Sequence, residues 1–98
     1  MDTIRTLTEQ TIPYLIAARR DLHRIPELAF EEVKTAAYVA KALADMGLPV
    51  DTGIAGTGVI GLLETNRPGP VVMIRADMDA LPITECTGLE YCSLHEGC

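Results

Sequence analysis

The sequence is poor in aromatic residues: its 98 residues include no tryptophan, one phenylalanine and three tyrosines. Any hydrophobic core must therefore be built mainly from aliphatic side chains and alanine, which fits a hydrophobic content of 48%. A chain of this length is one small domain or a piece of a larger one. Because such a chain buries only about 60–65% of its unfolded surface, its core is expected to be marginal.

Basic residues and long apolar runs are also scarce. Eight Lys and Arg oppose 14 Asp and Glu, which gives a net charge of −6 and excludes the basic surface that nucleic acids and anionic membranes require. No apolar run approaches the ~20 residues of a membrane span, and residues 1–10 lack the pattern of a signal peptide. The cysteines Cys86, Cys92 and Cys98 cannot all pair within the chain. We therefore expect reduced thiols and a cytoplasmic location, with no nucleic-acid or membrane partner.

Helix-like spacing of apolar residues predicts two helices in the first half of the chain. The first spans residues 3–24. Pro26 is expected to end it, because the residue before a proline disfavours the α conformation. Pro13, inside the helix, is expected to kink it or to split off its first turns. The second helix is predicted at about residues 30–46.

The second predicted helix carries its own end signals. Glu31 and Glu32 fall in its first turn, where they complement the helix dipole, and Gly47 is placed to be its C-cap. Its buried stripe is predicted to consist of Val33, Ala36, Ala37, Ala40, Leu43 and Ala44. We expect this stripe and the first helix to pack on one side of a sheet.

After Pro49 the pattern changes to that of strands. Three strands are predicted, at residues 49–54, 56–65 and 70–78. The last two flank the turn-forming sequence NRPGP, so we expect them to pair as an antiparallel hairpin. From Leu81 onward no period is sustained and a loop is predicted. The order helix, helix, strand, strand, strand is the opening of an α/β domain that is incomplete over residues 1–98.

The third predicted strand ends in two aspartates, Asp77 and Asp79. Both share a strand face with Arg75, and their carboxylates would lie roughly 7 Å apart. At that distance they repel by about 2–2.5 kcal/mol at an effective dielectric constant near 20. Either Arg75 neutralises Asp77 and leaves Asp79 to cap the next turn, or a divalent metal lies at the strand end, where sites in α/β sheets gather. Spacing alone does not decide between them.

Other candidate ligands are scattered along the chain. His23 falls among arginines on the first helix, where a solvated or capping role is favoured over a functional one. His95 and Cys98, three residues apart, could ligate zinc, but two potential ligands do not make a site. No nucleophile elbow, P-loop or dinucleotide-binding fingerprint is present. The residues alone therefore lead to the start of an acidic α/β domain whose third strand ends at a candidate metal site.

Four stretches, in order, resemble the N-terminal part of the M20 metallopeptidase family, in its amidohydrolase branch of hippurate, N-acyl-amino-acid and auxin-conjugate hydrolases. They are RRDLHRIPELAFEE (19–32), GIAGTGVIGLLE (53–64), IRADMDALPI (74–83) and TGLEYCSLHEG (87–97). The resemblance implies that residues 1–98 are an N-terminal fragment of an α/β catalytic domain. It also implies hydrolysis of N-acyl amino acids by water that two divalent metal ions, zinc or manganese, activate.

The resemblance also implies roles for the aspartates. Asp79 matches a family aspartate that supports the metal ligands without binding the metal. Asp77 stands where the wider family has a metal-binding histidine, as is usual in this branch, and with Arg75 it is expected to support Asp79. The family's ligands begin in a His-Ala-Cys-Gly-His-Asp motif that follows the segment matching residues 91–98. No metal ligand is therefore expected within this chain, and the chain should hold no metal tightly.

The sequence departs from the family pattern at a few positions. Ile25 stands where the branch commonly has a second histidine, while Cys92 and Glu96 replace a small residue and a proline. We expect the 98-residue chain to be inactive by itself and to belong to a longer enzyme that acts on a small N-acyl amino acid. The alternative is a stand-alone binding or regulatory module derived from the same domain. A homodimeric parent and self-association of the fragment are both compatible with the resemblance.

Overall fold

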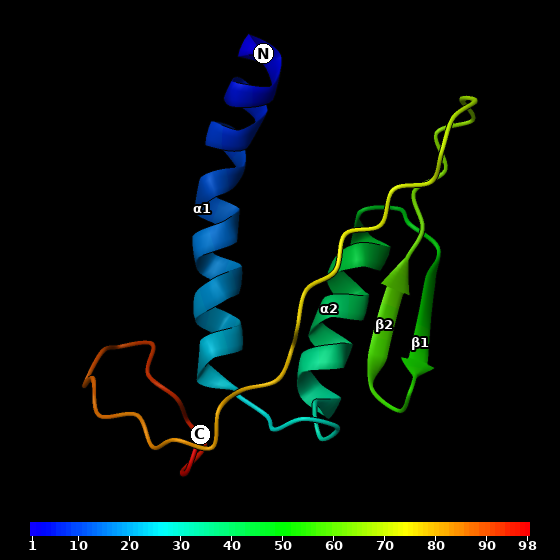
Figure 1. Ribbon diagram of the computed structural model, residues 1–98. Coiled ribbons are helices and arrows are strands. Elements are labelled where there is room, and N and C mark those ends of the chain that lie inside the picture. The colour runs from blue at the N-terminus through cyan, green and yellow to red at the C-terminus, as the bar shows by residue number, and fades with distance from the viewer.

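The computed structural model describes all 98 residues and contains two helices and two strands. Helix α1 spans Asp2–Arg24 and α2 spans Val33–Asp45, while β1 (Val50–Ile54) and β2 (Gly58–Gly61) form an antiparallel hairpin. Helix α2 lies along this hairpin and α1 stands apart from it (Figure 1). Residues 62–98 are extended or loop-like chain. The α/β class and both predicted helices are confirmed.

Helix α1 continues without interruption through Pro13, so the expected splitting of its first turns does not occur. All its residues are at least partly exposed, so water can reach the backbone carbonyl of Glu9, which the proline leaves without a donor. The helix ends at Arg24, with Ile25 as its C-cap, as Pro26 predicts.

Helix α2 begins three residues later than predicted, at Val33. Glu32 is its N-cap and Glu31 lies outside it, so neither carboxylate is in the first turn. Phe30 has a left-handed backbone (φ 64°), and this conformation interrupts the helical path before α2 starts. The other end agrees with the prediction, because Gly47 follows α2 with φ +83°, a conformation that glycine adopts without strain.

The contact between α2 and β2 is close because of a glycine. A Cβ atom added to Gly61 would lie 3.1 Å from Cδ1 of Leu43. The predicted stripe is only partly correct: Ala36, Ala40 and Leu43 are half-buried, whereas Val33, Ala37 and Ala44 are exposed. The prediction assumed that α2 would be covered by both a sheet and the first helix. Helix α1 reaches α2 through a hydrogen bond from the Tyr38 hydroxyl to Asp21 at 2.9 Å, but it does not cover the exposed half of the stripe.

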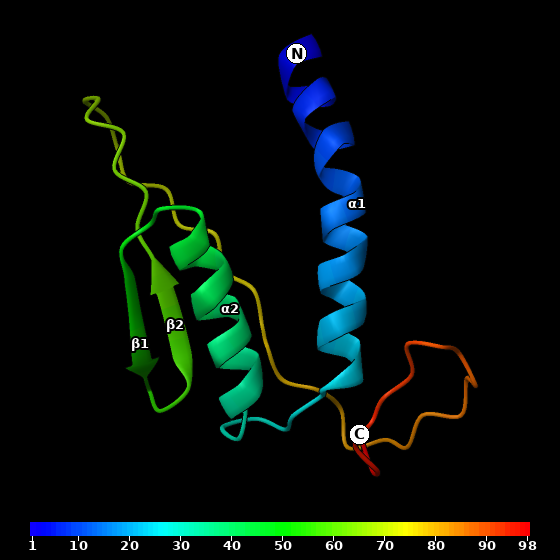
Figure 2. The same cartoon turned by 180° about the vertical axis from the view of Figure 1, so that it is seen from behind.

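The third predicted strand is not part of the sheet. Residues 71–79 run extended between α1 and α2 in both views (Figures 1 and 2), and no backbone–backbone hydrogen bond involves residues 63–79. The hairpin is instead formed by β1 and β2, so the predicted pairing of 56–65 with 70–78 is wrong. The NRPGP sequence reverses the chain, but a reversal alone does not align the two arms for cross-strand hydrogen bonds.

The molecule is open, and no apolar side chain in it is fully buried. The side chains of Val71–Ile74 are 82–94% exposed, whereas the only buried residues are Glu32 and Thr35. The radius of gyration is 15.8 Å, against about 13 Å for a compact domain of 100 residues. The expected packing of both helices on one side of the sheet is therefore wrong. Neither helix has the length and apolar character needed to cross a membrane.

Replacing Leu43 with aspartate should separate α2 from the hairpin, because a charge would face the closely packed Gly61. We expect the free energy of unfolding to fall by about 2–4 kcal/mol. Lys41→Asp on the same helix, at a side chain 78% exposed, should change it by less than about 1 kcal/mol. Thermal unfolding followed by circular dichroism measures both. Equal losses of stability would contradict the assignment of the packed face.

The exposed apolar segment Val71–Ile74 should make the 98-residue chain self-associate, because its side chains and both backbone edges lack partners. The double variant Val72→Lys and Ile74→Lys should shift the chain toward monomer in light scattering after size exclusion. Val33→Lys is the control, since Val33 is also exposed (70%) but lies outside this segment. If the control dissociates the oligomer as well, the segment is not the cause.

Candidate functional site

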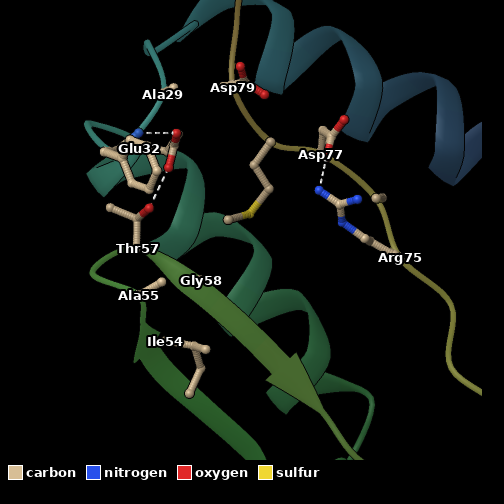
Figure 3. A pocket seen from close by; sticks show the side chains of 12 residues that line it. Ala29, Glu32, Ile54, Ala55, Thr57, Gly58, Arg75, Asp77 and Asp79 are labelled. Carbon is tan, nitrogen blue, oxygen red and sulfur yellow. Dashed lines mark hydrogen bonds and ion pairs between the residues drawn. The ribbon is translucent and has the colours of Figure 1, made fainter.

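The two aspartates that end the predicted third strand border an open cleft of about 280 Å³. The cleft is formed by residues 75–79, the loop before α2 and the turn between β1 and β2 (Figure 3). Within it Arg75 donates a hydrogen bond from Nη2 to Oδ1 of Asp77 at 3.1 Å. Both side chains are mostly exposed, so this pair contributes only about 0.2–1 kcal/mol. The pairing of Arg75 with Asp77 that the sequence allowed is therefore present.

Asp79 is separate from this ion pair. Its side chain is exposed and lies apart from Arg75 and Asp77 (Figure 3). The residue that follows it makes one backbone hydrogen bond: the N–H of Ala80 donates to the backbone carbonyl of Glu27 at 2.8 Å. Asp79 thus stands at the point where the extended segment meets the chain leaving α1.

The opposite wall of the cleft is held by Glu32, one of the two buried residues. Its Oε1 accepts the N–H of Phe30 at 2.6 Å, and its Oε2 accepts the hydroxyl of Thr57 in the hairpin turn. One carboxylate therefore joins the start of α2 to the hairpin. Sequence reasoning gave Glu32 only a dipole role, because its partner Thr57 is 25 residues away.

Glu27, five residues earlier in the same connection between α1 and α2, performs a similar task and was not predicted from the sequence. Its carboxylate accepts the N–H groups of Thr35 (2.6 Å) and Lys34 (3.1 Å) and the Thr35 hydroxyl (2.8 Å). These amides belong to the first turn of α2, where backbone donors have no partner within the helix. Partial burial raises the pKa of Glu27, but the hydrogen bonds from Thr35 and Lys34 outweigh it and leave the pKa below its ordinary value.

Residues 81–98 form a loop that leaves the base of α1 and returns to it (Figures 1 and 2). Nε2 of His23 lies 2.7 Å from Oε1 of Glu85, and since a carboxylate can only accept, His23 donates. The guanidinium of Arg20 lies 4.4 Å from the ring centre of Tyr91, a cation–π contact. The capping or solvated role predicted for His23 is therefore incomplete, since His23 also contacts a loop more than 60 residues away.

Glu85 is the centre of the loop's own hydrogen bonds. Besides His23, it accepts the hydroxyl of Thr87 and the N–H of Ser93, the latter at 2.9 Å. Its side chain is only 13% exposed. The hydrogen bonds from Thr87 and Ser93 are the main reason why the pKa of Glu85 lies below its ordinary value, with His23 adding to the effect.

No group of three or more His, Cys, Asp or Glu side chains is arranged to hold a metal ion. His95 and Cys98 both direct their donors at the carbonyl oxygen of Pro26, from Nδ1 at 2.7 Å and from Sγ at 3.4 Å. All three cysteines are free thiols. The side chains of this chain therefore do not fit a metal centre by themselves.

Comparisons with known proteins identify similar chains. No family model matches. The chain is 44% identical over 95 residues to "Probable hydrolase sll0100" of Synechocystis sp., covering 96% of this chain and 24% of that protein. It is 41% identical to the N-acetyl-L-cysteine deacetylase of Bacillus subtilis, with the same coverages. It is also 41% identical to thermostable carboxypeptidase 1 of Saccharolobus solfataricus, covering 86% of this chain and 22% of that one.

A solved structure is similar as well. The YXEP protein of Bacillus subtilis, a dinuclear metal-binding peptidase of the M20 family, superposes with a TM-score of 0.83 at 41% identity. The match covers 91% of this chain and 25% of that one. The chain thus spans about a quarter of the length of the relatives it matches.

The lowered pKa of Glu85 makes the docking of the loop depend on pH. The stabilisation is fully present above the ordinary pKa of 4.5 and is lost as the pH falls through the lower pKa of the folded state. We expect the amide proton of Ser93, which donates to Glu85, to shift in an NMR titration with a midpoint below 4.5. Glu85→Gln should abolish the titration, and a midpoint above 4.5 would contradict the geometry.

Proposed function

This chain belongs to the M20 family, to whose N-terminal part it corresponds, and we propose that it is a segment of a longer metal-dependent amidohydrolase that cleaves N-acyl amino acids. The observation that carries the proposal is similarity along 96% of the chain to a deacetylase of an N-acetylated amino acid. The same similarity covers only 24% of that relative, so most of an active site would lie in the remaining sequence.

The metal ions are assigned to that remaining sequence. The YXEP protein binds two metals, whereas no side-chain group of residues 1–98 is arranged for one. Such ions supply an activated water for attack on an amide carbonyl. Zinc and manganese are the two candidates we retain. Alone, the 98-residue chain is expected to show no hydrolysis.

The role proposed for this segment's own residues centres on Asp79. Its carboxylate is exposed and free of Arg75, while the adjacent Ala80 is fixed to Glu27. A carboxylate that is held in place but not neutralised is suited to accept a hydrogen bond from a metal-binding side chain and to orient it. Asp77, paired with Arg75, is assigned a supporting role.

The proposed enzyme acts on a small N-acyl amino acid in the cytoplasm. The acidic composition supports neither a nucleic-acid nor an anionic membrane partner. The alternative, a stand-alone binding module, is tested by the coding sequence after codon 98. A His-Ala-Cys-Gly-His-Asp motif there, in frame or after a frameshift, supports the enzyme; unrelated sequence or a genuine end of the gene would favour the module.

In the full-length protein, Asp79→Asn should keep the fold and lower turnover of N-acyl amino acids by about 10- to 100-fold, because the amide orients a ligand less well. Asp77→Asn is the matched variant on the same segment. This variant should lower turnover by less than about 5-fold, since it removes only an exposed ion pair worth about 0.2–1 kcal/mol. Steady-state kinetics and the metal content of the purified protein are measured for both variants. An Asp79→Asn enzyme with unchanged turnover and metal content would refute the assignment.

A further inference from the structure

The carbonyl groups at the end of α1 act as a single attachment point for the loop after Asp79. Pro26 stops the helix, so the carbonyls near it have no intrahelical partner. Three of them accept from the two ends of the loop: Glu27 from the N–H of Ala80, Arg24 from the N–H of Leu94, and Pro26 from Nδ1 of His95. The two ends, 14 residues apart, thus meet on neighbouring residues.

The tip of this loop is held by the same helix. Arg20 and His23 lie on one face of α1, three residues apart, and contact Tyr91 and Glu85. The rings of His23 and Tyr91 are also arranged edge to face, at 6.1 Å between centroids. Because Glu85 accepts the N–H of Ser93, the loop is closed internally as well. A 6- to 16-residue loop with adjoining ends and its own internal packing is an Ω-loop, a class that is often functional.

From these contacts we infer that residues 80–94 form an Ω-loop that fixes the position of Asp79, and that His23 and Glu85 are its positioning residues. The inference rests on the proposed function. Ala80 is held by one backbone hydrogen bond, which contributes only about 0.5–1.5 kcal/mol. By itself that bond cannot keep the adjacent Asp79 in one place. Docking of the tip through His23 and Glu85 limits the movement of the whole loop and therefore keeps the Ala80 end attached.

The test compares His23→Ala, Glu85→Ala and the double variant in the full-length protein. We expect each to lower kcat for an N-acyl amino acid about 10-fold with KM changed less than about 3-fold, because displacement by about 1 Å affects the reacting geometry more than binding. The double variant should be no worse than either single one. Glu85→Gln should retain most of kcat, because its carbonyl still accepts from Ser93.

The matched control is another 2.7 Å side-chain hydrogen bond, from Lys41 to Asp45 on α2, which does not touch the loop. Lys41→Ala should leave kcat unchanged. Hydrogen exchange gives the second readout: the amides of Ala80 and Ser93 should exchange faster in both loop variants and not in the control.

The two proposals fail in different ways. If Ala80 exchanges faster while kcat stays at the wild-type value, the positioning role is wrong and the hydrolase assignment stands. If its exchange does not change, His23 and Glu85 do not hold the loop and the inference is wrong. A wild-type protein that hydrolyses no N-acyl amino acid overturns the proposed function and, with it, the role of Asp79.

Discussion

Pro26 determines much of what is ordered in this chain. It ends α1, and the backbone groups released there accept hydrogen bonds from segments that follow 53 to 70 residues later. Glu27, the next residue, adds a carboxylate that caps the first turn of α2. A single turn of chain between the two helices therefore holds the start of α2, the end of the aspartate segment and both ends of the loop. If this turn changed conformation, the hydrogen bonds that hold these segments next to one another would be lost.

Hydrogen bonds to carboxylates replace the packing that a small domain would ordinarily use. No apolar side chain is buried, whereas Glu32 is only 6% exposed and joins α2 to the hairpin turn. Glu27 and Glu85 have lowered pKa values because donors surround them. Charge-assisted hydrogen bonds of this kind are stronger than neutral ones and more demanding of geometry. In the longer enzyme proposed above, further sequence would cover the exposed apolar surfaces.

Local sequence signals predicted where the two helices lie, but not which segments contact one another. The end of α1 at Pro26 and the glycine after α2 depend on backbone conformation at one or two residues, so the sequence contains them in full. The pairing of Arg75 with Asp77, which spans two residues, was one of the two alternatives that the sequence left open. The roles of Glu27, Glu32 and Glu85 were not predicted, because each depends on a donor 8 to 62 residues away. The misplaced hairpin has the same origin, since NRPGP fixes a reversal but not a partner.

The extended segment Val71–Ile74 has a consequence for biosynthesis. A protein four times as long as this chain requires about 300 further residues, which take roughly 15–60 s at about 5–20 residues per second. Throughout that time the apolar side chains and open edges of the segment would remain exposed to solvent. A domain in which an early segment pairs only with late ones has high contact order and folds slowly. The rate of translation would then limit how soon the apolar side chains of this segment are covered.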